Sequence, residues 1–336
     1  MVSDISIAVV GATGLVGGVM LQVLQERGFA NSRVIAAASP RSVGRKIAYG
    51  DSELTVVSVE QAIDQRPTYA IFSAGAAASR QYAPLFAEAG TTVIDNSSAW
   101  RMDDKVPLVV PEINMDAVAD GCRLIANPNC STIQMVLAIS RLHQAYRLRR
   151  IVVSTYQSVS GSGQRGISQL EAEETYGHCD EAQRFYPHPI HRNVLPHGGD
   201  FLPDGYTTEE QKLVNETRKI LGDNTIGISA TVARVPVVGG HSESVNAEFH
   251  SPVDLDQVRQ LLAATPGVTL MDAPDRNIYP TPLAAHHSDQ VLVGRLRMDP
   301  SQPNTVNLWI TADNLRKGAA TNAIQILQAL EHRRSH

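Results

Sequence analysis

The sequence predicts an α/β protein with two domains, the first built on a mostly parallel sheet and the second of the α+β type. The 336 residues are 43% hydrophobic, which is enough apolar material for two cores of ordinary size. Short apolar runs alternate with helical patterns in the first part of the chain, which is typical of a sheet covered by helices on both faces. Longer strands of alternating polarity follow, and these indicate a second sheet with one covered face.

The first domain opens with a strand, a tight turn and a helix. Residues 5–10 form an apolar run that ends at Gly11, and residues 15–26 repeat apolar side chains at helical spacing. The same patterns predict strands at residues 33–38, 54–57, 69–72, 92–94, 108–110 and 124–126, and a helix at residues 77–89. Such alternation favours parallel strands joined by crossover helices.

A helix that ends near residue 145 leads into the second domain. The strands predicted there lie at residues 150–159, 226–235, 244–250, 290–297 and 305–312, and the helices at residues 163–176, 208–221 and 315–331. We expect the last helix to pack back on the first domain, so residues 1–130 and 315–336 form one domain and residues 131–314 the other. The stretch 177–205 is rich in His, Pro and Gly and lacks periodicity. It is too long for an ordinary connection, so it is either functional or an arm between domains.

Charge and composition exclude several classes of partner. The chain carries 29 Lys and Arg against 34 Asp and Glu, a net charge of −5, so neither nucleic acid nor a membrane is expected as a partner. The sequence begins without a basic leader and has no apolar stretch long enough for a membrane span, which predicts a cytoplasmic protein. Three cysteines are an odd number, which argues against a disulfide framework and leaves at least one thiol free.

The turn after the first strand has the glycine spacing of a phosphate-binding turn. Its sequence is Gly11-Ala-Thr13-Gly14-Leu15-Val16-Gly17, between a strand and a helix, where backbone N–H groups and the helix dipole converge on an anion. This context favours a Rossmann-type dinucleotide-binding domain. The alternative is a tight turn whose glycines only allow the helix to pack closely on the sheet.

The end of the second strand distinguishes between two cofactors. Domains of this kind that bind NAD usually carry an acidic residue there, about 20 residues after the glycine turn. Here the segment is Ser39-Pro-Arg41-Ser42, and Arg pairs bidentately with a 2′-phosphate that a carboxylate would repel. We therefore predict NADP, with a solvated loop that merely contains an arginine as the alternative.

Cys130 lies between an apolar strand and a helix, where the positive field of the helix N-terminus lowers the pKa of a thiol. Asn129 either caps that helix or points its amide at an anion beside the thiol. A cysteine can also be a small buried hydrophobic residue, and we assign that role to Cys122. Further along, an apolar strand ends at Arg234, and His241 follows two glycines before the next strand. These two offer a substrate anchor and an acid or base, although a lone histidine can be purely structural.

Five sequence blocks together resemble the aspartate-semialdehyde dehydrogenase family, and they span nearly the whole chain. The blocks are Gly11-Ala-Thr-Gly-Leu-Val-Gly17, Asn127-Pro-Asn-Cys-Ser-Thr132, Arg234-Val-Pro-Val, Gly240-His-Ser-Glu-Ser-Val245 and Asp313-Asn-Leu-Arg-Lys-Gly318. The resemblance implies NADPH-dependent reductive dephosphorylation of aspartyl phosphate to aspartate semialdehyde through a cysteine thioester, in lysine, methionine, threonine and diaminopimelate biosynthesis. It also implies a Rossmann-type domain, a catalytic and dimerisation domain, and a homodimer or a dimer of dimers.

The resemblance assigns roles to individual residues and implies no metal. Cys130 matches the nucleophile, His241 the general acid and base, and Gln157 a residue that orients the substrate. Arg234 matches the residue that binds the substrate carboxylate, and Glu209 the residue that meets its amine. The remaining matches are Arg101, Asn129 and Lys212 for phosphate, Ser39, Arg41 and Ser42 for the 2′-phosphate, and Gly11, Thr13, Gly14, Leu15, Val16, Gly17 and Asn314 for the rest of the cofactor. The chain departs from the family pattern at Gln211 and at Gly198-Gly199.

Three other functions remain open at this point. N-acetyl-γ-glutamyl-phosphate reductase uses similar chemistry, but its substrate has no free amine for Glu209 to meet. A zinc-stabilised binding protein would use His178, Cys179, His188, His191 and His197, whose spacing repeats no common ligand pattern. A non-catalytic relative would bind NADP only, and the presence of Cys130 and His241 argues against it.

Overall fold

The computed structural model describes residues 5–335, and these divide into two compact units. One unit runs to Asn129 and resumes at Ala319, and the other comprises Cys130–Gly318. The first contains an all-parallel sheet and the second a mixed sheet, which confirms the predicted fold class. No helix among the described residues is long and apolar enough to span a membrane.

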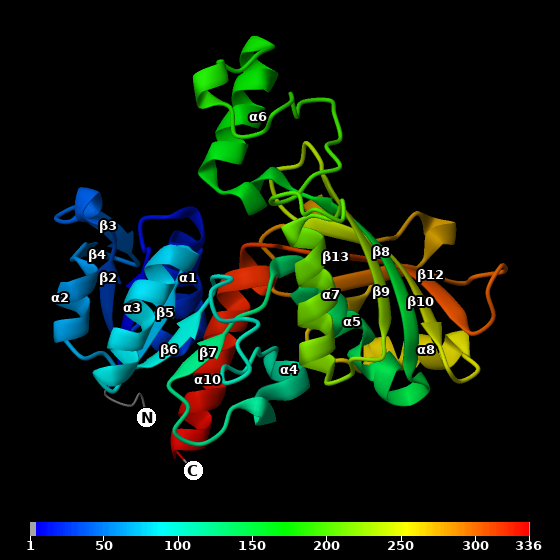
Figure 1. Ribbon diagram of the computed structural model, residues 1–336, viewed down its shortest axis with the longest axis horizontal. Helices are drawn as coiled ribbons and strands as arrows, with labels where there is room; N and C mark the ends of the chain where they lie inside the picture. The colour runs from blue at the N-terminus through cyan, green and yellow to red at the C-terminus, as the bar shows by residue number, and fades with distance from the viewer. Residues whose placement is uncertain (1–4, 336) are drawn as a thin grey trace. The chain divides into compact units, whose positions relative to one another are not determined.

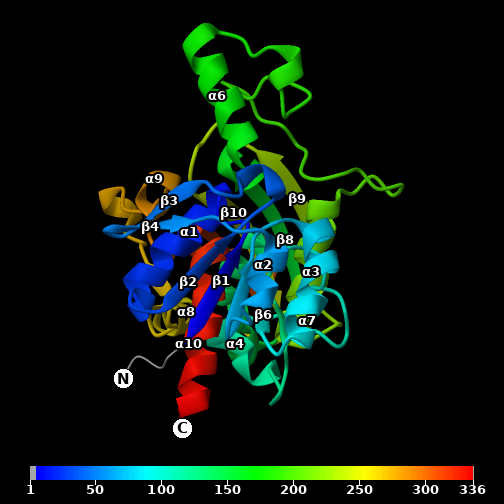
Figure 2. The same ribbon diagram turned by 90° about the vertical axis from the view of Figure 1, so that its left-hand side faces the viewer.

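The first unit is a parallel sheet with helices on both faces (Figure 2). Its five strands have the order β2-β1-β5-β6-β7 and are β1 (Ser6–Val10), β2 (Arg33–Ala37), β5 (Tyr69–Phe72), β6 (Thr92–Asp95) and β7 (Leu124–Ala126). One face packs on α1 (Leu15–Leu24) and α10 (Thr321–Ser335), the other on α2 (Val59–Asp64) and α3 (Ala76–Glu88). The strands are apolar on both faces because both are covered, and the C-terminal helix packs on this domain as predicted.

Two predicted strands of the first unit differ in the structure. Instead of one strand at residues 54–57, an antiparallel hairpin forms from β3 (Lys46–Tyr49) and β4 (Ser52–Thr55). Its turn contains Gly50 at φ +57°. Because many of its residues are polar and exposed, the hairpin shows no clear alternation of apolar and polar residues in the sequence. The predicted strand at residues 108–110 is only a single bridge between Leu108 and Ala126. Prolines at positions 107 and 111 flank it, and proline has no N–H to donate to a ladder.

The second unit is built on a six-stranded sheet with the order β11-β12-β13-β10-β8-β9. Its strands are β8 (Leu148–Gln157), β9 (Gly227–Arg234), β10 (His241–Phe249), β11 (Val268–Leu270), β12 (Val291–Met298) and β13 (Thr305–Ala312). Helices α5 (Cys130–Tyr146), α7 (Thr208–Leu221) and α8 (Leu255–Ala263) pack against it (Figure 1). On β8 the buried residues alternate with exposed ones, and Tyr156 packs on Trp309 with ring centroids 5.3 Å apart. The prediction of one covered face is therefore confirmed.

The stretch 177–205 begins and ends in this second unit, so it does not connect the two domains. It follows α6 (Gln164–Tyr176), which Figure 1 shows projecting from the sheet. The Glu173 carboxylate accepts the backbone N–H groups of Ile190 and His191 over 2.7 and 2.8 Å. Further along, Leu195 and Arg234 form an antiparallel bridge. The stretch therefore folds back on its own helix and on the edge of β9.

Candidate active site

The glycine turn of the first unit leads from β1 into α1. A Cβ on Gly17 would lie 2.2 Å from the Gly11 carbonyl oxygen, and one on Gly11 would lie 2.4 Å from the Ser73 carbonyl oxygen. Packing alone therefore requires these two glycines. The start of α1 has Gly14 as its N-cap without a side-chain cap, and no acidic residue in its first turn. An uncapped helix start of this kind suits an anion.

The predicted 2′-phosphate residues lie close to this turn. Residues Pro40–Ser42 form a short 3-10 helix directly after β2, and Thr13 Oγ1 lies 3.5 Å from Ser42 Oγ. Ser39 and Arg41 are exposed. The structure thus brings the hydroxyl at residue 42 to the glycine turn and leaves a guanidinium beside it in solvent, which fits a phosphorylated dinucleotide.

Cys130 is the first residue of α5 and is partly buried. A Cβ on Gly318 would lie 2.8 Å from the Cys130 Cβ, so the glycine that ends the fifth sequence block leaves room for the cysteine. Gln157, at the end of β8, donates from Nε2 to Ser131 Oγ over 2.7 Å. The predicted substrate-orienting amide is therefore held at the helix turn that carries the predicted nucleophile.

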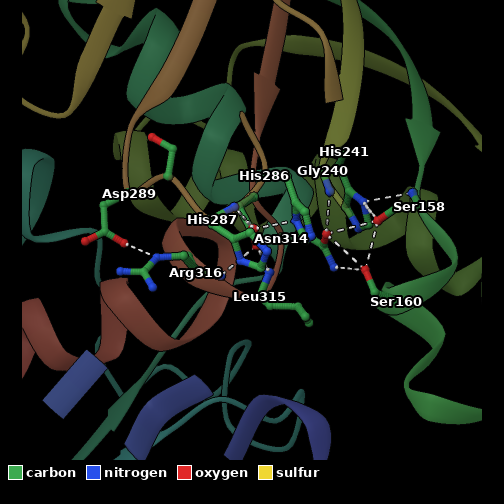
Figure 3. A network of polar contacts seen from close by, with 12 residues as sticks. Ser158, Ser160, Gly240, His241, His286, His287, Asp289, Asn314, Leu315 and Arg316 are labelled. Atoms are coloured by element: carbon green, nitrogen blue, oxygen red, sulfur yellow. Dashed lines mark hydrogen bonds and ion pairs between the residues drawn. The ribbon is translucent and has the colours of Figure 1, made fainter. Parts of the chain in front are cut away.

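His241 is the first residue of β10, whereas the sequence had placed it before the strand. His241 pairs with Ala312 of β13, so the hydrogen-bonded ladder between the two strands extends to His241. The side chain is fully buried, and burial together with the Arg234 guanidinium lowers the pKa of the imidazole to about 3. Its Nδ1 lies 3.0 Å from both the backbone N and the Oγ of Ser158 (Figure 3).

Arg234 and His241 converge on Gly161. A Cβ on this glycine would lie 2.7 Å from Arg234 Nη1 and 3.0 Å from His241 Nε2. Arg234 Nη1 also donates to the Ser158 carbonyl over 2.7 Å. The structure therefore brings together a cation and an imidazole that lie seven residues apart at the ends of two different strands. The role of Gly161 was not predicted, because only the fold places these side chains against it.

Glu209 and Lys212 lie near the start of α7. Their side chains form an ion pair, with Lys212 Nζ 2.7 Å from Glu209 Oε2, and the Glu209 carboxylate acts on His241 by favouring its charged form. The helix starts with a capping box formed by Thr207 and Glu210. The departure at Gly198 has a packing reason, since a Cβ there would lie 2.6 Å from a methyl group of Val232.

The predicted phosphate-binding residues belong to different units. Arg101 and Asn129 lie in the first unit and Lys212 in the second. Both first-unit residues are buried, and Arg101 Nη2 donates to the Asn96 carbonyl over 2.9 Å. Their joint role in binding phosphate stays a prediction. Asn127, from the same block as Cys130, has a structural role instead, since its amide bonds to Asn96 and Asn322.

Among residues 5–335, one group of side chains has a spacing that suits a metal ion, namely His286, His287 and Asp313. It includes none of the five residues of the zinc alternative. The Asp313 carboxylate accepts the backbone N–H groups of His287, Leu315 and Arg316 and lies 3.1 Å from His286 Nδ1. Through these four bonds the Asp313 carboxylate anchors a turn, and this structural role accounts for the arrangement (Figure 3).

Two buried features escaped sequence reasoning. Ser158, Ser160 and Asn314 form a hydrogen-bonded cluster beside His241. Asn314 had been assigned to the cofactor only through the resemblance, and that role stays a prediction. Glu243, two residues beyond His241 on β10, is fully buried, and burial raises the pKa of its carboxyl well above the usual value. Alternation along β10 places it on the same face as His241, but the sequence offered no sign that this carboxyl lies under α5.

Comparisons with known proteins show the family to which the chain belongs. Residues 6–121 match the family model for the semialdehyde dehydrogenase NAD binding domain, and residues 139–317 match the semialdehyde dehydrogenase dimerisation domain. Aspartate-semialdehyde dehydrogenases of Aquifex aeolicus and Legionella pneumophila are each 46% identical and cover 96% and 98% of this chain and 97% of their own. A crystal structure of aspartate semialdehyde dehydrogenase II from Vibrio cholerae superposes with a TM-score of 0.93 at 44% identity, covering 98% of this chain and 99% of that one. The chain therefore belongs to the aspartate-semialdehyde dehydrogenase family.

Proposed function

We propose that this protein is an NADP-dependent aspartate-semialdehyde dehydrogenase that interconverts aspartyl phosphate and aspartate semialdehyde. The observation that carries the proposal is the convergence of Arg234 and His241 on Gly161, in the same unit as Cys130 and Gln157. A related structure from Vibrio cholerae, 43% identical, was solved in complex with ASA. An acyl-phosphate substrate with a carboxylate needs a nucleophile, an oxyanion donor and a cationic anchor, and these residues supply all three.

Cys130 is proposed as the nucleophile. Its position at the start of α5 stabilises a thiolate, which displaces phosphate from the acyl phosphate and forms a thioester. When bound, NADPH supplies the hydride that reduces this thioester. The resulting tetrahedral oxyanion collapses to the aldehyde and returns the electron pair of the C–S bond to sulfur. His241 interacts with the oxyanion, and Gln157 orients the substrate.

Arg234 is proposed to hold the substrate carboxylate. Its side chain is buried, and its Nε has no hydrogen-bond partner among the described residues. A planar guanidinium with an unused donor is suited to a bidentate bond with a carboxylate. Glu209 is proposed to bind the amine of the substrate, and Arg101, Asn129 and Lys212 its phosphate.

The cofactor is proposed to bind at the glycine turn of the first unit. Gly11, Thr13, Gly14, Leu15, Val16 and Gly17 would hold the pyrophosphate, since the helix start there has no side-chain cap. Ser39, Arg41 and Ser42 would hold the 2′-phosphate that distinguishes NADP from NAD. Asn314, in the second unit, completes the proposed set.

We propose that the enzyme works in the cytoplasm as a homodimer formed through the second domain. The matching family model is described as a dimerisation domain. The face of the second sheet opposite α5 carries aromatic side chains, and Tyr156 there is 37% exposed. Light scattering of the purified protein, with Tyr156→Glu as the disrupting variant, tests this assembly.

A spectrophotometric assay with aspartate semialdehyde, phosphate and NADP tests the activity. We expect phosphate-dependent formation of NADPH, with much slower reduction of NAD because NAD lacks the 2′-phosphate. Absence of phosphate-dependent turnover would refute the proposal and support a non-catalytic NADP-binding relative. Faster turnover of the N-acetyl-γ-glutamyl substrate in a parallel assay would assign the protein to that reductase instead.

A further inference from the structure

Arg101 ends a loop that begins directly after β6. Its side chain is buried, and its Nη2 donates to the backbone carbonyl of Asn96 over 2.9 Å. Asn96 is the first residue after β6, and its own N–H donates to the Phe72 carbonyl of β5 over 3.0 Å. The guanidinium is therefore held by a residue that is itself bonded to the sheet, so the position of Asn96 determines where the charge of Arg101 lies.

Asn127 bonds this loop to a neighbouring segment of the chain. It follows β7, which pairs with β6, and its N–H donates to the Asp95 carbonyl over 2.8 Å. Its side chain extends this contact, since Nδ2 donates to Asn96 Oδ1 over 2.7 Å. We call Asn96 and Asn127 the asparagine bridge. Asn129, a second residue of the proposed phosphate site, lies two positions further along the chain, so the bridge joins the segment of Arg101 to the segment of Asn129.

The amide of Asn127 can take only one orientation. Asn322 Nδ2 donates to the Val109 carbonyl over 2.9 Å and to Asn127 Oδ1 over 2.7 Å. Because a backbone carbonyl can only accept, the group of Asn322 that faces it is the NH₂, and Asn127 must accept through its oxygen. Asn127 Nδ2 is then directed to Asn96 and, over 3.3 Å, to the Ala319 carbonyl. Both amides are fully buried, where hydrogen bonds are stronger than in water.

The rest of the loop has hydrogen bonds of its own. The Asp95 carboxylate accepts from the backbone N–H and the hydroxyl of Ser97 over 3.0 and 2.6 Å. Trp100 Nε1 donates to Ser79 Oγ, on α3, over 2.9 Å. These bonds do not involve the asparagine bridge, so we expect loss of the bridge to shift the loop without unfolding it.

We propose that Asn96 and Asn127 are positioning residues that place the Arg101 guanidinium for the binding of phosphate. Asn322 serves the same end by fixing the amide of Asn127. A guanidinium binds phosphate through a planar fork whose orientation matters, and an arginine that is already held in place loses less conformational entropy when the anion binds. The choice of phosphate as the anion rests on the proposed function, whereas the placement of Arg101 rests on the hydrogen bonds of the bridge.

Phosphorus-31 NMR of inorganic phosphate, titrated into the full-length protein, tests the proposal without any measurement of activity. Asn127→Ala removes the bridge, and we expect the Kd for phosphate to rise about tenfold because Arg101 is no longer held in place. Asn96→Ala leaves the bond between Asn127 and Asn322 intact and should have the same effect, which keeps the test decisive if Asn127→Ala does not fold. An unchanged Kd in folded protein, or a wild type that does not bind phosphate, would overturn the proposal.

Asn114→Ala is a matched control in the same unit. The Asn114 side chain also makes two hydrogen bonds, accepting from the Val110 N–H over 2.9 Å and donating to the Leu108 carbonyl over 2.8 Å. Both partners belong to its own segment of the chain, so we expect the wild-type Kd for phosphate. A tenfold rise in this variant as well would show that loss of any such amide weakens phosphate binding, and would contradict a specific role of the bridge.

A double variant separates positioning from a general structural effect. Arg101→Ala removes the guanidinium, and in this background Asn127→Ala should change the Kd for phosphate less than about twofold, because the bridge acts only through Arg101. A further tenfold loss in the double variant would overturn the proposal, since Asn127 would then affect phosphate by another route.

Steady-state kinetics extend the test to turnover. In the assay with aspartate semialdehyde, phosphate and NADP, Asn96→Ala should raise the KM for phosphate about tenfold and leave the other two KM values within about twofold of the wild type. Equal rises in all three KM values would indicate a general loss of structure and contradict the positioning role. Phosphate binding that depends on the bridge, in a protein without dehydrogenase turnover, would instead refute only the proposed function.

Discussion

The sheets of the two domains differ in how many polar side chains they bury. In the first domain, the cores on the two faces of the sheet consist of apolar residues, such as Ile7 and Val9 on one face and Ala8 and Val10 on the other. In the second, the sheet buries several polar groups at one end, namely Gln157, Ser158, Arg234, His241 and Glu243. Burial of apolar surface stabilises a fold, whereas burial of polar groups costs stability unless each finds a partner. The comparison indicates that the second domain buries polar groups whose burial costs stability wherever a partner is missing.

The two domains also differ in how far apart in sequence their cooperating residues lie. The glycine turn of the first domain is a single run from Gly11 to Gly17. In the second domain, Ser158 bonds to His241 and Asn314 across 83 and 156 residues. A phosphate can be held by one local turn, but a buried network of polar side chains requires partners from several strands and loops.

The largest effect is expected from Cys130→Ser, which tests whether the chemistry belongs to the second domain alone. A serine hydroxyl is hardly ionised near neutral pH, so we expect kcat to fall at least about 10³-fold. Binding of NADPH to the first domain should be unchanged in a fluorescence titration. Activity within tenfold of the wild type would contradict the nucleophile assignment, and lost NADPH binding would contradict the division of roles between the domains.

Glu243→Gln tests how much the burial of a polar group lowers the free energy of unfolding of the second domain. Burial raises the pKa of this carboxyl in the folded state, so the folded protein holds a proton that the unfolded chain releases above about pH 4.5. Stability is therefore lost as pH rises, by at most about 1.4 kcal/mol per pH unit, and the glutamine variant avoids this loss. Urea denaturation at several pH values should show equal stability near pH 5 and a growing advantage of the variant toward pH 8.

A matched control for this comparison is Glu248→Gln on the same strand. The Glu248 carboxylate pairs with Arg149 at 3.0 Å, so its removal should give no advantage at any pH. An advantage that is equal for both variants would show that a general change in net charge, rather than burial at Glu243, produces the effect.

Arg41→Ala tests whether the first domain recognises the 2′-phosphate, just as Cys130→Ser tests whether the second domain supplies the nucleophile. A charge-assisted bond to phosphate is worth about 1.5–3 kcal/mol, so the Kd for NADPH should rise about 10- to 100-fold. The Kd for NADH, which lacks the 2′-phosphate, should change little. Arg45→Ala, a few residues further along the same segment and exposed, serves as the control. Equal weakening of both cofactors by Arg41→Ala would mean that this residue does not bind the 2′-phosphate.

The smallest effect is expected from the helix caps, and the structure describes a capping box in each domain. Ser58 caps α2 in the first domain and Thr207 caps α7 in the second. Removal of a cap costs about 0.5–2 kcal/mol, and we expect Thr207→Ala to lie at the upper end because Thr207 is buried and the Ser58 cap bonds are exposed. Thermal denaturation of both variants measures the difference. A larger cost at Ser58 would show that burial does not determine how much a cap contributes here.

The sequence by itself determined the features that depend on neighbours in the chain. The strand, glycine turn and helix at Gly11, and the cysteine at the start of α5, were all predicted from local pattern. The fold class followed from the spacing of apolar residues, because the periods of strands and helices are themselves local.

Only the tertiary structure decided which buried polar groups meet. It placed His241 on β10, brought Arg234 to it at Gly161, and supplied Ser158 and Asn314 as partners. It also buried Glu243 under α5, where a glutamate in a strand carries no local sign of its environment. The tautomer of a histidine and the pKa of a carboxyl depend on the donors, charges and water around them. Strand pairing brings these surroundings together from residues far apart in the sequence, so no local pattern can predict them.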